Sequence, residues 1–133
     1  MVPVQATFQS VLASTRRVRF DRSDMETLKA YKSSVAGTPK DVVLHPMHKD
    51  KVKEAFDNGY IVLSCPHYEA DFAFVKIDAG RSVFGGQKSR VNCYVAIFNE
   101  LMPGPNYKDL GAALSAINDI HKLVESKIAQ AGL

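Results

Sequence analysis

The sequence has only two cysteines and no long apolar run, and each shortage excludes a class of protein. Cys65 and Cys93 lie 28 positions apart, which forms neither a C-x-x-C motif nor a disulfide framework. Both fall within apolar strand patterns, so we expect them to be buried as small hydrophobic side chains. No apolar run approaches the roughly 18 residues of a membrane span, and polar residues interrupt the N-terminal segment where a signal peptide would need its apolar core. We therefore expect a cytoplasmic protein with no membrane contact.

The composition is that of an ordinary globular protein. The chain has 133 residues, of which 46% are hydrophobic and 23% are charged. This length suits one domain that buries a core without disulfides or metals, and the composition is far from that of a disordered chain. We expect a single domain over residues 1–133.

The net charge of +3 is unevenly distributed. Residues 1–40 carry seven Lys and Arg against three acids, an excess of four, whereas the rest of the chain is close to balanced. The excess centres on four arginines: Arg16, Arg17, Arg19 and Arg22. Such a cluster is typical of a surface that contacts nucleic acid or another polyanion, and a solvated face is the competing interpretation.

Three helices are predicted, over residues 23–36, 47–58 and 107–131. Ser23 and Glu26 form a capping box for the first helix, and Gly37 suits its C-terminal end. Pro46 occupies the first position of the second helix. Asn106 is the expected cap of the third, which is long and amphipathic.

Alternating and continuous apolar patterns predict strands over residues 41–45, 60–65, 71–78 and 91–100. Residues 16–21 also alternate, and residues 4–14 fit either a strand or a helix. The fold predicted is α+β: a three- to five-stranded mixed or antiparallel sheet packed with about three helices. The segment 41–65 fits a parallel crossover, but its connection is barely long enough, so an antiparallel pair is the alternative.

The strands over 71–78 and 91–100 are apolar on both faces, so both faces require a cover. Either the helices divide between two sides of the sheet, or an aromatic face forms an assembly surface between copies. The aromatic residues concerned are Phe72, Phe74, Tyr94 and Phe98. Because one domain of this size has few helices, we expect self-association.

Three of the four histidines lie near two predicted strand ends. If these strands run parallel, their carboxyl ends meet at one edge, where open α/β sheets place ligands. Imidazole, thiolate and carboxylate groups there suit zinc or a similar divalent metal. The candidate ligands are His45, His48, Cys65, His67 and Asp71. H-x-x-H followed by C-x-H matches no established metal signature, so structural histidines are the competing interpretation.

Residues 79–90 form a basic, glycine-rich connection that we interpret as a hairpin arm. It differs from a phosphate-binding loop because Gly86 and Gln87 intervene before Lys88-Ser89 and a strand, not a helix, follows. A flexible basic arm suits contact with a nucleic-acid backbone or a neighbouring subunit. Phe84 at its tip suits stacking on a base or insertion into a partner's pocket, and an ordinary loop tip is the competing interpretation.

No Ser–His–Asp order, paired acidic motif or dinucleotide fingerprint is present in the sequence. We therefore predict a non-enzymatic binding or assembly protein that self-associates, needs no cofactor and contacts nucleic acid or a protein partner. The predicted contact residues are Arg16, Arg17, Arg19, Arg22, Arg81, Phe84, Lys88 and Arg90. The alternative is a small metal-dependent hydrolase for a phosphate or nucleotide substrate, using His45, His48 and His67.

Overall fold

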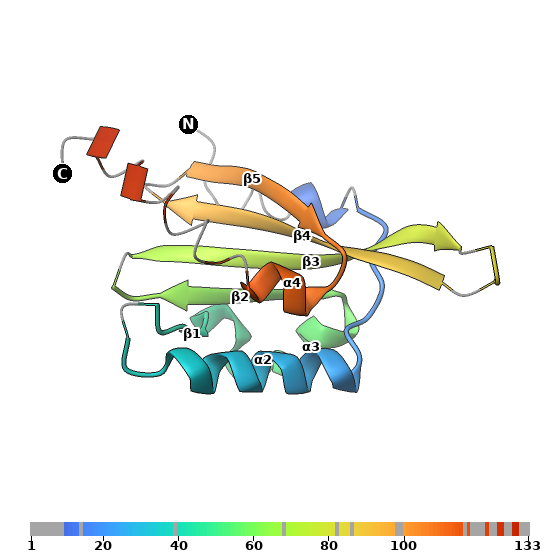
Figure 1. Cartoon of the computed structure of the whole chain (residues 1–133), viewed down its shortest axis with the longest axis horizontal. Helices are drawn as coiled ribbons and strands as arrows, with labels where there is room; N and C mark the ends of the chain where they lie inside the picture. Colours follow the sequence, from blue (N-terminus) through green and yellow to red (C-terminus); the bar gives the residue numbers. More distant parts are fainter. Residues whose placement is uncertain are drawn as a thin grey trace.

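The protein folds as one antiparallel five-stranded sheet packed with helices (Figure 1), so the predicted α+β class is confirmed. This computed structural model describes residues 10–13, 15–38, 40–67, 69–81, 83–85, 87–97, 100–115, 117, 122, 125–126 and 129–130. The elements are α2 (Arg22–Val35), β1 (Val43–Leu44), the 3-10 helix η1 (Pro46–His48), α3 (Val52–Asp57), β2 (Tyr60–Cys65), β3 (Ala70–Arg81), β4 (Gln87–Ile97), β5 (Glu100–Tyr107) and α4 (Leu110–Ser115).

The strands follow one another across the sheet in chain order, and every pairing is antiparallel. β1 pairs with β2 through Val43 opposite Ser64. The parallel crossover is therefore wrong and its antiparallel alternative is correct. The connecting residues form two short helices, η1 and α3, rather than the single helix expected over 47–58. Pro46 does occupy the start of η1, as predicted.

The N-cap of α2 lies two residues before the predicted cap, Ser23. Asp21, in an extended conformation, is the N-cap, and Asp24 completes the capping box in place of Ser23 and Glu26. The Asp24 N–H donates to Asp21 Oδ1 at 2.9 Å, and the Asp21 N–H donates to Asp24 Oδ2 at 3.0 Å. Carboxylates are stronger acceptors than a hydroxyl and also suit the positive end of the helix dipole. The backbone hydrogen bond from Asp24 holds the pKa of Asp21 below its usual value, and Lys76 nearby acts in the same direction.

The C-terminal region differs most from the prediction. Residues 100–107 form the edge strand β5, although Pro103 and Pro105 lie within it. Proline is tolerated on an edge strand because the missing N–H can face away from the neighbouring strand. Asn106 belongs to β5, and Asp109 caps α4 instead by accepting from the Ala112 N–H at 2.8 Å. The long helix over 107–131 is not confirmed, because beyond α4 the described positions are too few to trace it.

The strand expected over residues 16–21 is reduced to one bridge, between Arg17 and Ile77. Residues 10–13 are helical, and residues 4–9 lie outside the described part of the chain. The bridge forms where β3 extends past the start of β2 at Tyr60, which leaves the edge of β3 open.

The main core lies between the sheet and helices α2, α3 and α4 (Figure 1). Phe72 and Phe74 belong to this core and are fully buried. Tyr94 pairs with Ala73 and therefore lies on the opposite face, so the predicted aromatic face is wrong; Phe98 is outside the described residues. Cys65 and Cys93 are buried in the core, and burial raises the pKa of the Cys93 thiol to about 12.

The second face of the sheet carries a smaller apolar cluster. Val62, Ala73 and Val75 are buried there, with Leu12 packed against them from the helical residues 10–13. The chain itself therefore covers the centre of this face. The expectation of self-association depends on an uncovered sheet face. Because Val62, Ala73 and Val75 are buried within the chain, they do not need a second copy to cover them.

Candidate nucleic-acid interface

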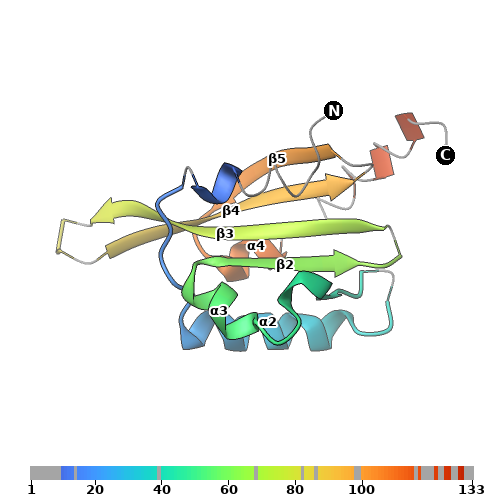
Figure 2. The same ribbon diagram turned by 180° about the vertical axis from the view of Figure 1, so that it is seen from behind.

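The β3–β4 hairpin extends beyond the rest of the sheet as a two-stranded arm (Figures 1 and 2). β2 begins at Tyr60, opposite Val75, and β5 ends at Tyr107, opposite Val91. From residue 76 to residue 90 the hairpin thus has neither β2 nor β5 beside it. We call residues 76–90 the arm; it begins three residues earlier than the loop identified from the sequence.

The arm is irregular near its end. The pairing between β3 and β4 shifts between Asp78 and Arg81. Gly80 has a φ of +95°, and its N–H donates to Asp78 Oδ1 at 2.9 Å. An irregularity of this kind increases the local twist of a hairpin and turns its end away from the plane of the sheet.

A strap of residues 16–18 crosses the base of the arm. The Val18 N–H donates to the Lys76 carbonyl at 3.0 Å, and the Asp78 N–H donates to the Arg16 carbonyl at 2.8 Å. The two basic segments that the sequence presents some 60 positions apart are therefore adjacent in space. Sequence reasoning named both segments but gave no sign of this contact.

The strap can approach β3 only because residue 59 is glycine. Gly59 is buried and has a φ of +78°. A Cβ at this position would lie 2.5 Å from the Val18 carbonyl oxygen and 3.0 Å from Cβ of Arg17. In the sequence, Asn58-Gly59 indicates only the end of a helix. The packing role of Gly59 cannot be recognised from that pattern.

Three cations lie on one face of the arm. Arg17 pairs with Ile77, and Ile77 pairs with Arg90 on its other side, so these three side chains point to the same face of the hairpin. Lys88 is two residues from Arg90 on β4 and shares that face. We call Arg17, Lys88 and Arg90 the cationic row.

Within the described residues, no acidic side chain forms an ion pair with a member of the cationic row. The opposite face of the arm is different, because Lys76 there pairs with Asp24 at 2.7 Å and with Asp21 at 3.8 Å. The side chains of Lys76 and Asp24 are only 13% and 14% exposed, so this pair ties the arm to α2. The arm therefore has one charged face available to an anion and one that is internally neutralised.

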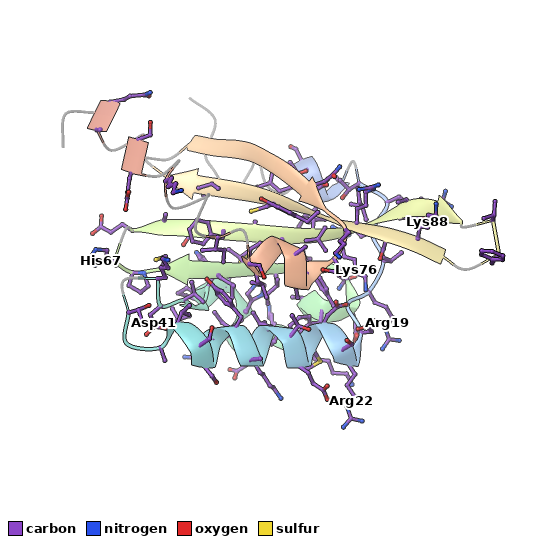
Figure 3. The ribbon with its side chains drawn as sticks, viewed as in Figure 1. Arg19, Arg22, Asp41, His67, Lys76 and Lys88 are labelled. Carbon is purple, nitrogen blue, oxygen red and sulfur yellow. The ribbon has the colours of Figure 1, made fainter. Side chains whose placement is uncertain are left out.

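The remaining predicted arginines contribute less to this face. Arg16 is 3.9 Å from Asp78, and Arg22 is 3.6 Å from Glu26 on the next turn of α2. Figure 3 shows Arg19 and Arg22 near the start of α2, away from Lys88 on the arm. Arg19 is exposed, and the side chain of Arg81 lies outside the described part of the structure.

The tip of the arm presents apolar side chains to solvent. Val83 is 97% exposed and Phe84 is 96% exposed. Gly85 follows with a φ of +86°, which places the turn beside the phenylalanine. The ring thus projects from the end of a basic hairpin.

The histidine candidates have separate surroundings. His48 is 2% exposed, and its Nε2 accepts from the Val62 N–H at 2.9 Å. Burial lowers the pKa of His48, and His45 nearby lowers it further. His45 Nδ1 accepts from the Met47 N–H at 3.0 Å, and its Nε2 lies 3.5 Å from Asp71 Oδ2.

The antiparallel pairing explains this separation. His45 lies beside Val62 in the middle of β2, whereas Cys65 ends that strand and His67 follows in an exposed turn (Figure 3). Cys65 belongs to the main core, whereas its neighbour Ser64 faces the other side and donates to Asp71 Oδ1 at 2.7 Å. Among the described residues, no group of three or more histidine, cysteine or acidic side chains is arranged to hold a metal ion.

Ser64, Asp71 and His45 form a short polar chain that sequence reasoning did not identify. The carboxylate stands between the hydroxyl and the imidazole, so Ser64 donates its hydrogen to Asp71 and not to a histidine. A serine nucleophile needs the base next to it, so this order does not activate Ser64.

Comparisons of the chain with protein-family models, curated proteins and solved structures found no match. Within the described residues, no helix has the length and apolar character needed to cross a membrane.

Proposed function

We propose that this protein is a non-enzymatic binding protein whose arm contacts a polyanion. The observation that carries the proposal is the cationic row: Arg17, Lys88 and Arg90 share one face of a protruding hairpin and have no acidic partner among the described residues.

The three cations of the row lie close together, because Arg17 and Arg90 flank Ile77 and Lys88 is two residues from Arg90. On the opposite face of the same hairpin, Lys76 is held by two aspartates, so the fold does pair cations with acids where they serve packing. Lys88 and Arg90 are exposed and Arg17 is partly buried. Unpaired cations grouped at a surface raise the local potential and attract a ligand with several negative charges. The backbone of a nucleic acid is such a ligand, and its binding releases counterions.

The test is a set of salt-dependent binding curves for a labelled single-stranded oligonucleotide, measured by fluorescence anisotropy. Three phosphate contacts give a slope of log K against log salt of about −2 for a single strand. The triple variant Arg17→Gln/Lys88→Gln/Arg90→Gln is expected to lose roughly tenfold or more in affinity at low salt and most of this slope.

The matched control removes the same charge from elsewhere on the protein. Lys29, Lys49 and Lys51 are exposed and lie outside the arm and the strap. The variant Lys29→Gln/Lys49→Gln/Lys51→Gln should bind nearly as the parent does. Absence of binding by the parent at low salt, or equal losses in the two triple variants, would overturn the proposal.

A further inference from the structure

We infer that the arm takes single-stranded nucleic acid, with the cationic row on the phosphates and the Phe84 ring stacked on a base. This inference rests on the proposed function, because it specifies the polyanion that the same arm binds.

The first step of the argument is the exposure of Phe84. Among the described phenylalanines and tyrosines, it is the only one that is exposed; the other phenylalanines are buried and the tyrosines are partly buried. A single exposed apolar side chain is ordinary on a protein surface, so the exposure of Phe84 gains its meaning from the cations that share the arm.

The second step is the chemistry around the ring. The tip offers one further apolar side chain, Val83, and the described cations of β4 follow at Lys88 and Arg90. A protein pocket that binds a phenylalanine is usually surrounded by further contacts that exclude water, and a narrow hairpin tip has little area for them. Stacking on a base needs a single exposed ring beside a cationic track, which the arm provides.

The third step is geometric. Lys88 and Arg90 are two residues apart on one face of a strand, about 6.6 Å along the chain, and so present charges in a line. An extended phosphate backbone is also a line of charges. Only a single strand leaves its base faces free at the same time, because a duplex stacks its bases internally.

The experiment compares three labelled probes of equal phosphate number: a single strand, the same strand with abasic sites throughout, and a duplex. Phe84→Ala should weaken binding of the single strand by about 5- to 100-fold. The same variant should bind the abasic strand as the parent does, because the phosphate contacts remain. Val83→Ala is the matched control at the same tip and should change neither affinity.

A second measurement uses the absence of tryptophan from the chain. Phe84→Trp retains an aromatic ring and introduces a single indole fluorophore. Its emission should be quenched by the single strand and remain unchanged with the abasic strand. Both variants change a side chain that is almost fully exposed, so folding should be preserved.

Equal affinity of the parent for the single strand and the abasic strand, together with no effect of Phe84→Ala, would overturn the inference. If the cationic row variant still lost binding in that case, the proposed function would stand and only the base stacking would fail. An unquenched Phe84→Trp on a bound single strand would also overturn it and leave the ring free for a protein pocket.

Discussion

His48 completes the hydrogen bonding of β2 where β1 is too short to do so. β1 pairs with β2 only at Leu63 and Ser64, so the Val62 N–H needs another acceptor. The imidazole Nε2 of His48 supplies it at 2.9 Å. An accepting Nε2 requires a neutral ring with its hydrogen on Nδ1. Protonation of His48 would therefore leave a buried N–H without an acceptor.

This role predicts a pH dependence of stability. Burial lowers the pKa of folded His48 below its ordinary value of 6.5, so between these two values the unfolded chain binds more protons than the folded one. The contribution is fully present above about pH 6.5 and is lost as the pH falls through the folded pKa. His48→Gln offers an amide oxygen as acceptor without titrating, and we expect it to remove this part of the decline in the free energy of unfolding between pH 7 and pH 5.

Urea unfolding at a series of pH values measures this decline. His67→Gln is the control, since His67 is exposed in the turn after β2. The prediction is wrong if the two variants decline equally with pH. Two side chains lie near the His48 ring, His45 and Tyr60, and the Tyr60 ring centroid is 5.8 Å from that of His48. Both residues are the same in the two variants.

At the scale of single residues, the sequence predicted burial well and hydrogen-bond roles poorly. The burial of Cys65 and Cys93 followed from their positions in apolar strands, because free cysteine behaves as a small hydrophobic side chain and is buried with its apolar neighbours. The role of His48 depends on Val62, which is 14 residues away and is brought close only by the antiparallel pairing. The cap of α2 was misplaced by two residues because Asp21 and Ser23 are both good caps.

At the scale of elements, the contact between the strap and the arm depends on Gly59. Its Cβ would meet a backbone carbonyl, which cannot move aside as a flexible side chain can. We expect Gly59→Ala to destabilise the protein well beyond the roughly 1–2 kcal/mol that a left-handed backbone conformation costs an L-residue. The hydrogen exchange of the Val18 and Asp78 amides, which join the strap to β3, should also become faster.

Gly37 provides the control for Gly59. It has nearly the same φ, +79°, but nothing lies within 4 Å of its Cβ position. Gly37→Ala should therefore incur only the conformational cost and leave amide exchange in the strap unchanged. Equal losses of stability in the two variants would show that the close approach of the strap is not important.

The elements themselves were predicted where their pattern is local. Strands β2, β3 and β4 and helix α2 follow from period-2 and period-3.6 patterns in the sequence. β5 could not be predicted, because Pro103-Gly104-Pro105 is typical of a chain break and becomes a strand only beside the regular edge of β4. The metal hypothesis depended on a parallel pairing, and two strands alone do not specify their relative direction.

At the scale of the whole molecule, the sheet has two edges that are poorly suited to pair with another chain. β1 is only two residues long, and β5 contains two prolines. Short and proline-containing edge strands prevent uncontrolled pairing between sheets. The arm is the part of the described chain that reaches outward, so binding through its side chains does not require an open sheet edge.

The order of the strands also has a consequence for how the protein folds. Each strand pairs with its neighbour in the chain, so the pairings have small entropic costs. The longest connection, residues 45–59 between β1 and β2, contains η1 and α3. The strap is the exception, since Arg17 must find Ile77 across about 60 residues. We expect the β3–β4 hairpin to form early and the strap to join it late.

Stopped-flow refolding tests this order. Val75→Ala, in the centre of β3, should slow refolding, because its contacts form in the transition state. Gly59→Ala, which disturbs the strap, should mainly accelerate unfolding. The reverse assignment would contradict the order. If the hairpin forms first, as expected, the arm exists before Arg17 of the strap reaches its base. The last step of folding is then also the step that completes the cationic row.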